Sequence, residues 1–259
     1  MTCGLLSNLQ GTLTVTEGDG SERVTEVSAR ALIGPLAEYQ VYLTLRGRAL
    51  AKAAEQLQQQ IAAGDLSAAQ QAYREARTVD QQMALAVGLF SDLDQRLNAR
   101  ADYFALREQD PEFMGFQRLA YSLFEQQSLD GLLPVAEQLN LDVADLRERL
   151  RAEGVPAPQL ARGAGSVLQA WHAQQQGQAQ LSELALADLM SLQQGVDKVV
   201  SLVVPVLQQA HPEQAAHLAE ANQALAAQMS EGIAPSVLPL TEALAAQLAN
   251  VNPLLAAAN

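Results

Sequence analysis

Few side chains in this sequence could bind a metal ion or transfer a proton, and they are scattered along the chain. The three histidines, His172, His211 and His217, have no second histidine at a ligand spacing. His172 follows Trp171 near the end of a predicted helix, and His211 precedes Pro212, where a helix should end. A metal site needs several converging ligands. We therefore predict structural roles for all three histidines.

Carboxylates and tyrosines are the other groups that could act in a site. Four aspartates remain as candidate weak cation ligands: Asp92, Asp94, Asp102 and Asp188. We expect them at exposed helix ends, where carboxylates interact with the helix dipole. The tyrosines should pack in the core with their hydroxyl groups at its edge: Tyr39, Tyr42, Tyr73, Tyr103 and Tyr121. The sequence has no glycine-rich phosphate loop, no nucleophile motif and no His-Glu-x-x-His motif, so no enzyme activity is predicted.

The composition favours an all-α protein with a sizeable core. The chain has 259 residues, of which 49% are apolar but only 4% aromatic. Alanine, leucine and glutamine are abundant, and these residues favour helices over strands. The net charge of -13 makes nucleic acid and anionic lipid unsuitable partners. A single cysteine excludes an intrachain disulfide, and no apolar run is long enough to span a membrane.

The stretch from Asp110 to Arg149 contains the clearest helical elements. Asp110-Pro111 breaks the chain and precedes a short helix, and a turn at Ser128 to Gly131 precedes a second helix with Pro134 in its first turn. This second helix has an apolar stripe at alternating spacings of four and three: Leu132, Ala136, Leu139, Val143, Leu146 and Leu150.

The remaining chain also shows helical periodicity. We predict a first long helix that opens at Pro35 and stops at Gly64, with a new helix cap at Asp65. Its apolar stripe includes Leu50, Ala54, Leu57 and Ile61. A second helical run should extend from Ser67 to about Glu108, with a break near 88–92. After a break at 154–158, the pattern predicts helices at about 159–175, 181–209, 212–230 and 236–257.

The central stretch resembles a known family. The run from Glu112 to Ala120, then Leu123-Phe124, then the run from Gly131 to Leu139 is similar to the centre of the imelysin-type domain of the EfeO/EfeM family of periplasmic iron-uptake proteins. Weaker similarities extend over roughly 36–255, and they include these segments: 39–43, 63–66, 72–77, 90–102 and 186–200. The resemblance implies an up-down helical bundle in two four-helix-like halves, about 29–153 and 155–259.

The resemblance also implies a metal site whose ligands are missing here. The family places a His-x-x-Glu pair at the positions of Gln117 and Ala120, a Glu-x-x-Glu-like pair at Gln81 and Ala84, and an aspartate at Asn98. A His and a Glu three residues apart share a helix face and could bind one ion, whereas Gln is a neutral amide and Ala offers no ligand. We predict a degenerate site and no cofactor for this chain, with iron, zinc or copper in intact relatives.

The helix predicted after 181 continues the same pattern. Asp188 and Gly195 match the family, whereas Ala187 stands at its tryptophan position and Gln194 at an acidic position. All the substitutions at ligand positions remove charge or ligand strength. Carboxylates that face one another without a metal would raise each other's pKa, so neutral replacements relieve a repulsion.

The N-terminal residues resemble a different domain. Residues 1–17 are similar to the last loop and strand of the cupredoxin-like domain that precedes the imelysin-type domain, and Gly11 to Val15 alternates like a strand. Cys3 matches a candidate copper ligand of that domain but would need further ligands. Residues 18–28 read as a linker.

The N-terminus lacks a signal-peptide pattern, which places this chain in the cytoplasm unless it belongs to a longer exported precursor. An internal start within such a precursor, or loss of the front of the gene, would explain both the missing signal and the single remaining strand.

Three functions are considered. The first is a periplasmic component of an iron-uptake system with a degenerate metal site, which would work beside a membrane permease and a haem-type peroxidase. The second is a helical interaction or polymer-binding module without a metal. The third is a metallopeptidase, which needs a metal-bound water and a base that Gln117 and Ala120 do not supply.

Overall fold

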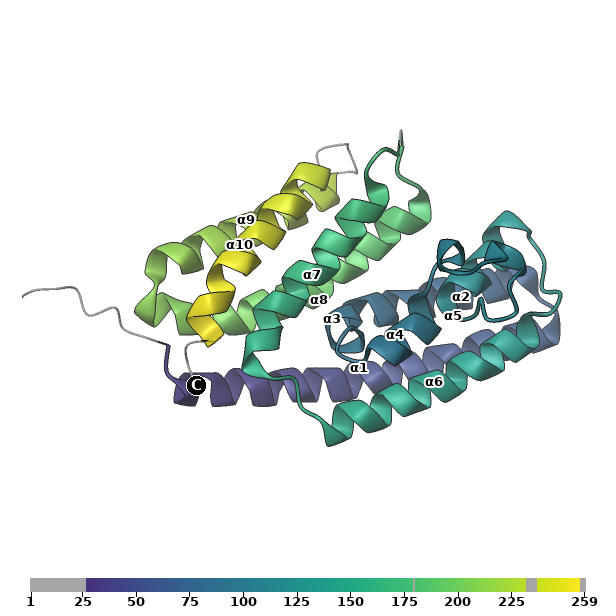
Figure 1. Ribbon diagram of the computed structural model, residues 1–259, viewed down its shortest axis with the longest axis horizontal. Coiled ribbons are helices and arrows are strands. Elements are labelled where there is room, and N and C mark those ends of the chain that lie inside the picture. The colour runs from purple at the N-terminus through teal and green to yellow at the C-terminus, as the bar shows by residue number, and fades with distance from the viewer. Residues whose placement is uncertain (1–26, 179, 232–236, 257–259) are drawn as a thin grey trace, which may run out of the picture.

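The computed structural model describes residues 27–178, 180–231 and 237–256, and all regular structure in these residues is helical (Figure 1). The predicted all-α class is confirmed for this part of the chain. Cys3, the predicted strand at Gly11 to Val15 and most of the predicted linker lie outside the described residues. The helices are α1 (Ala29–Ala63), α2 (Leu66–Gln82), α3 (Ala84–Val87), α4 (Ser91–Asn98), α5 (Gly115–Ala120), α6 (Leu132–Ala152), α7 (Ala157–Gln175), α8 (Glu183–Ala210), α9 (Pro212–Glu231) and α10 (Val237–Ala256).

Helix α6 follows the predicted pattern throughout. The six residues of its apolar stripe are all buried, and Pro134 lies in its first turn, where the missing N–H group has no helical acceptor to lose. Gly131 precedes the helix with φ of 69°, a left-handed conformation that glycine adopts without strain. The π-helical turn Tyr121–Glu125 extends α5 toward this loop.

Helix α1 begins earlier than predicted. It starts at Ala29, where the Ser28 side chain accepts a hydrogen bond from the Ala31 N–H, and Pro35 lies inside the helix. The prediction that Pro35 opens the helix is therefore wrong. Leu32, in the turn before the proline, is buried in the core. The predicted end is confirmed, because Gly64 ends α1 in a left-handed conformation.

The second predicted run is more interrupted than the sequence indicated. Helix α2 ends at Gln82, α3 and α4 are short, and the segment after Asn98 forms 3-10 turns at Ala101–Tyr103 and Arg107–Gln109. The prediction of a helical run that reaches Glu108 is therefore wrong. Gly195 of α8 approaches the end of α2 so closely that a Cβ atom there would lie 2.5 Å from the Gln82 carbonyl oxygen. This contact explains why the chain has glycine at that position.

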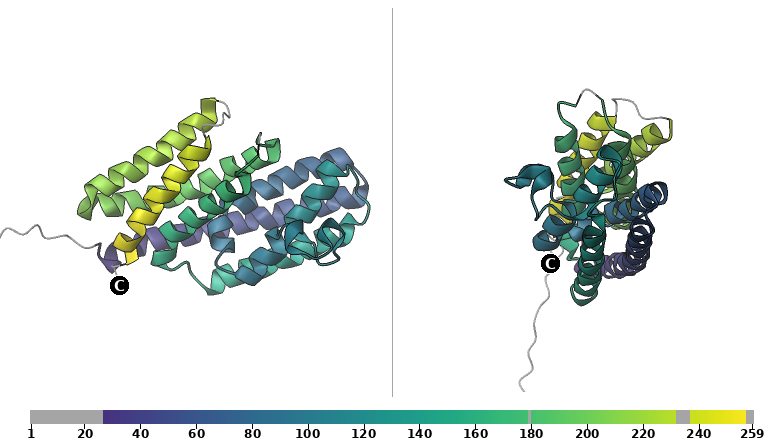
Figure 2. Two further views of the ribbon diagram at one scale, coloured as in Figure 1. Left: turned by 45° about the horizontal axis from the view of Figure 1, so that its top comes forward. Right: turned by 90° about the vertical axis from the view of Figure 1, so that its right-hand side faces the viewer.

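The helices pack around the long α1, which runs the length of the molecule (Figures 1 and 2). Helices α2 and α6 pack along its C-terminal half, while α7 to α10 pack mainly on one another. Helix α8 joins the two groups because it contacts both α1 and α2. The predicted helices after 154–158 are confirmed within one or two residues at each end, as expected for helix boundaries.

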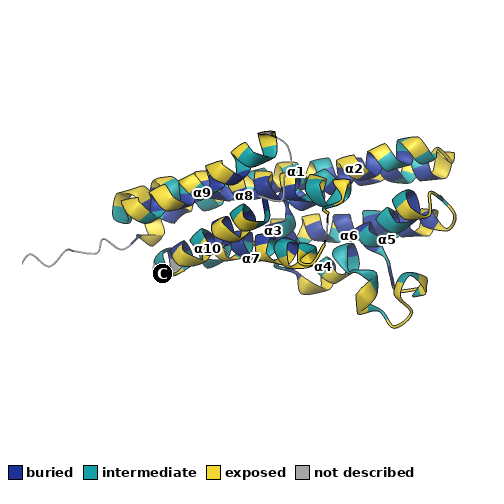
Figure 3. Cartoon of the chain, turned by 90° about the horizontal axis from the view of Figure 1, so that it is seen from above, coloured by how far each residue is buried: buried dark blue, intermediate teal, exposed yellow. Residues whose placement is uncertain are grey.

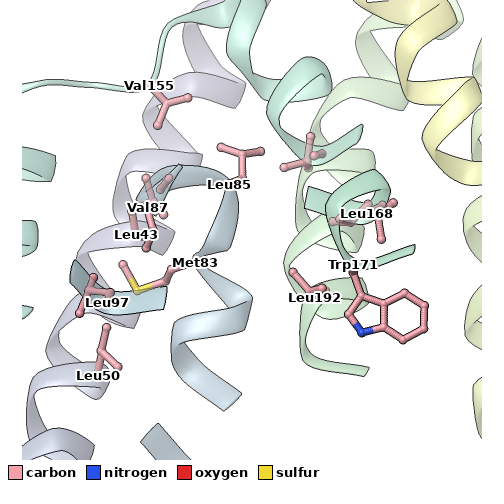
Figure 4. Close-up of a cluster of buried hydrophobic side chains, with 14 of the residues drawn as sticks. Leu43, Leu50, Met83, Leu85, Val87, Leu97, Val155, Leu168, Trp171 and Leu192 are labelled. Carbon is pink, nitrogen blue, oxygen red and sulfur yellow. The ribbon is translucent and has the colours of Figure 1, made fainter. Parts of the chain in front are cut away.

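One hydrophobic core runs through both groups of helices. Buried residues form stripes on the inward faces while the outer faces are exposed (Figure 3). Met83, Leu85 and Val87 of the short α3 region pack between Leu43 on α1 and Leu168 on α7 (Figure 4). No helix in the described ranges combines the length and apolarity needed to cross a lipid bilayer.

Candidate functional site

A buried group of charged and polar side chains lies where α2, α4 and α8 meet. Arg77 on α2 has a side chain only 10% exposed, and it forms ion pairs with Asp80 and Asp188. Its Nη1 atom lies 2.9 Å from Asp80 Oδ2, and its Nη2 atom lies 2.9 Å from Asp188 Oδ2. The Nε atom donates to Asp188 Oδ1 at 3.1 Å, so Asp188 binds the guanidinium through both oxygens. We call Arg77, Asp80, Asn98 and Asp188 the inner cluster.

Two of the positions predicted to match the family's metal site, Gln81 and Asn98, belong to this network. Asn98 on α4 accepts a hydrogen bond from Arg77 Nη1 at 2.5 Å and donates one to Asp94 at 3.0 Å. Gln81 donates from Nε2 to Asp80 Oδ2 at 3.1 Å. The Asn98 amide oxygen therefore already binds a cation, the Arg77 guanidinium.

Asp80 is the most buried member of the inner cluster, and one of its oxygens has no hydrogen-bond partner. It is 1% exposed, and its Oδ1 atom is buried without a hydrogen-bond partner. Burial raises the pKa of the Asp80 carboxyl to about 6, although the neighbouring Arg77 charge and the Gln81 amide act in the opposite direction. Desolvation of a carboxylate outweighs the attraction of a single shared guanidinium.

Two further positions predicted to match the family's metal site face a cleft. Gln117 and Ala120 on α5 line it together with Asp188 on α8 and Trp171 on α7, and its volume is about 500 Å³. The segment around Arg100 to Glu108 and the end of α7 complete the wall. Asp188 thus links the cleft to the buried inner cluster. The expectation of an exposed helix-end carboxylate is wrong for Asp188, whose side chain is 21% exposed and paired with Arg77.

The remaining candidates have other surroundings. Ala84 on α3 is half-buried against the hydrophobic core. Asp92 pairs with Arg96 and Arg149 on the surface, and Asp102 pairs with Arg100 at 3.3 Å.

The predicted roles of the histidines and tyrosines are partly met. His211 ends α8, as predicted, and His217 is exposed on α9. Tyr39 and Tyr73 are buried, as predicted, whereas Tyr103 is 78% exposed and that prediction is wrong. Tyr103 belongs to a 3-10 turn of the segment that was predicted to be helical.

The donor set at the five family positions does not fit a divalent metal ion. Two positions are alanines, and the three amides are Gln81, Asn98 and Gln117. The Asn98 oxygen is occupied by a guanidinium, which would repel a second cation. Within 27–178, 180–231 and 237–256, no three His, Cys, Asp or Glu side chains are grouped so that they could bind a metal ion.

The sequence analysis did not single out Arg77 and Asp80, although the pattern of α2 indicates that both are buried. The buried face of α2 has helical spacing and includes these residues: Ala69, Ala72, Tyr73, Ala76, Arg77 and Asp80. An arginine and an aspartate three residues apart on an otherwise apolar stripe indicate a buried pair, because charged residues are rarely buried alone.

The chain is similar in sequence to one protein family and to iron-uptake proteins of two bacteria. The family model described as Imelysin matches residues 35–256. The iron uptake system component EfeO of Yersinia pestis is 34% identical over 212 residues, which are 81% of this chain and 56% of that protein. The iron uptake system component EfeO of Escherichia coli (strain K12) is 31% identical over 215 residues, 82% of this chain and 57% of that protein. The chain thus spans a little over half the length of these relatives.

Proposed function

The chain belongs to the imelysin family, and from this premise we propose that it acts in iron uptake as an EfeO-like component whose family metal site does not bind a bare ion. The similarity to iron uptake system components over four fifths of the chain supports the first part. The second part rests on one observation: the buried guanidinium of Arg77, bound to Asn98, occupies the place where the family site would hold a metal ion.

An intact family site would use carboxylates and a histidine, which bind iron through negative charge and a nitrogen lone pair. Here Arg77 supplies the positive charge that balances Asp80 and Asp188. The proposal therefore assigns no resident metal or other cofactor to this chain. It also assigns no enzyme activity, because neither a metal-bound water nor a general base is provided at Gln117 and Ala120.

The location and partners follow from the same proposal. An EfeO-like component would act in the periplasm, as part of a longer exported precursor, beside an iron permease and a peroxidase. The imelysin-like domain with two four-helix-like halves would present the partner surface, and α8 would hold the two groups of helices together.

Calorimetry with ferrous iron and zinc on two proteins tests the metal part of the proposal. One is the natural chain, and the other carries five changes: Gln81→Glu, Ala84→Glu, Asn98→Asp, Gln117→His and Ala120→Glu. We expect binding only by the five-fold variant, since the added carboxylates and imidazole recreate a ligand set. Equal binding by the natural chain would show that the ligands lie elsewhere.

Failure of both proteins to bind would limit the family likeness to the fold. The alternative function, a helical interaction or polymer-binding module without a metal, would then move to first place. Thermal unfolding of the five-fold variant without metal provides the control, because five new polar or charged groups could also prevent folding.

A further inference from the structure

The cleft beside the inner cluster has the size and chemistry of a site for an organic molecule. Building on the proposed function, we propose that this cleft binds iron as a small, uncharged organic chelate of the ferric hydroxamate type, in place of a bare ion. The proposal is carried by three properties of the cleft: its volume, its charge balance and its free amide groups.

The volume far exceeds what a metal ion needs. Sites for small organic molecules measure roughly 300–1,000 Å³, and the cleft measures about 500 Å³. A bare ion coordinated by protein side chains lies about 2 Å from its ligands, so its site is closed by them. The walls of this cleft come from well-separated parts of the chain: α2, the segment 100–108, α5, the end of α7 and the start of α8.

The charged side chains on the walls are two arginines and four carboxylates, so the cleft carries a small net negative charge. Arg100 pairs with Asp102, and Asp188 is paired from behind by Arg77. The other charged groups of the wall are Arg107, Glu108 and Glu125. An anionic chelate such as ferric citrate would meet no excess of positive charge, and a free cation would meet no cluster of carboxylates. The small negative charge repels an anionic chelate, whereas an uncharged ligand is not repelled.

Four glutamine side chains supply the hydrogen-bonding groups. Gln117, Gln174, Gln175 and Gln178 all line the cleft. Within the part of the chain that the structure describes, none of their amide groups hydrogen-bonds to another protein group. Each amide offers two N–H donors and one carbonyl acceptor. Such groups recognise carbonyl and N–O oxygens without requiring a charge on the ligand.

A ferric hydroxamate chelate has the matching chemistry. Each hydroxamate group loses one proton and binds through two oxygens, so three groups neutralise Fe³⁺ and leave an uncharged complex. The oxygens at its surface accept hydrogen bonds. Binding requires no electron transfer and no exchange of ligands with the protein, which agrees with the lack of metal ligands at Gln117 and Ala120.

Trp171 provides a direct test, because it is the only tryptophan in the chain and lines the cleft. Its fluorescence is followed while ferric acetohydroxamate, prepared with excess acetohydroxamate, is added, and calorimetry gives a second readout. Acetohydroxamate alone, ferric citrate and ferrous sulfate are titrated in parallel. We expect saturable quenching and heat only with the uncharged ferric complex.

Variants locate the binding in the cleft. Gln117→Ala with Gln175→Ala should weaken binding roughly tenfold, because each lost neutral hydrogen bond changes affinity severalfold. Gln109→Ala with Gln176→Ala is the matched control, since both residues are exposed and neither lines the cleft. The control should bind like the natural chain.

Several outcomes overturn the inference: no binding of the uncharged complex, tighter binding of ferric citrate or ferrous ion, or equal effects of the two double variants. These outcomes leave the proposed function to its own experiment. If the five-fold variant binds iron while the natural chain binds no chelate, only the chelate inference is lost.

Discussion

Two arginine–aspartate networks in this protein use the same side chains in opposite surroundings. The inner cluster is buried between α2, α4 and α8, and Asp80 keeps one oxygen without a partner. The outer network joins α4 to α6 at the surface, where Arg149 binds Asp92 and Asp145 at 2.8 and 2.9 Å. Hydrogen bonds from Arg149 lower the pKa of both outer carboxyls, whereas burial raises that of Asp80.

The difference teaches that geometry alone does not decide what an ion pair contributes. The outer carboxylates remain hydrated while they pair with arginine. Pairing therefore favours their charged form with little loss of hydration free energy. The inner carboxylates lose water, and one guanidinium is shared between two of them. A buried network of this kind stabilises the fold weakly but is costly to break, because removing one partner leaves a buried charge unpaired.

The largest expected effect follows removal of the shared cation. Arg77→Met should lower the free energy of unfolding by about 3–5 kcal/mol, because Asp80 and Asp188 would then face each other without a counter-charge. Urea unfolding at pH 7 measures it. Arg74→Met, one turn away and exposed, is the control and should lose far less. A loss from Arg77→Met as small as that of the control would show that the inner cluster does not hold the helices together.

Adding Asp80→Asn and Asp188→Asn to Arg77→Met should recover part of the loss, since amides do not repel each other. This rescue separates the charge effect from the loss of packing, because Arg77 also lies over the Phe116 ring at 5.4 Å. Absence of any recovery would assign the loss to packing.

An intermediate effect concerns pH. The folded-state pKa of Asp80 is about 6, above the ordinary value of 3.8 for a free aspartate, because the carboxyl is buried. The folded protein therefore binds this proton more tightly than the unfolded chain, so the stabilisation is complete below pH 3.8 and is lost as the pH rises through 6. Since one pKa unit corresponds to about 1.4 kcal/mol, the loss is at most about 3 kcal/mol.

Asp80→Asn removes this titration, and unfolding curves between pH 4 and 8 measure the change. We expect the variant to gain stability relative to the natural chain as the pH rises across this range. The same difference at every pH would mean that Asp80 keeps its charge throughout, held by Arg77.

The smallest effect is expected in the outer network. Asp92→Asn should lower stability only slightly at pH 7, and added salt should reduce the loss further, because exposed pairs are screened. The lowered pKa values of Asp92 and Asp145 give the opposite sign to Asp80: their stabilisation is present above about pH 4 and is lost as the pH falls. A loss for Asp92→Asn comparable to that of Arg77→Met would remove the distinction between the two networks.

Most helices could be predicted because their signals are local. The stripe of α6, the glycine that ends α1 and the break near Pro156 each depend on residues within a few turns of one another. The helix boundaries that were predicted wrongly lie where segments distant in the sequence pack against one another. Helix α2 ends at Gln82, where Gly195, more than a hundred residues later in the chain, packs closely against its backbone.

The candidate site also combines features that the sequence shows locally with contacts that depend on the packing of distant helices. The sequence predicts that metal ligands are missing at five positions, and this stays a prediction: Gln81, Ala84, Asn98, Gln117 and Ala120. It could not indicate that Asn98 accepts a hydrogen bond from Arg77, or that Asp188 lies on the same cleft as Gln117. These pairs belong to different helices, and their distances depend on how the helices cross.

The sequence by itself determined the helical class and the positions of most helices, and it predicted neutral residues at the positions that resemble the family's metal site. Periodicity, capping and residue chemistry are properties of short segments, so they need no knowledge of the fold. Only the tertiary structure decided that one buried arginine serves two aspartates, and that free amides gather around a cleft. Desolvation depends on every neighbouring element, and a pKa or a binding site therefore appears only once the helices have packed.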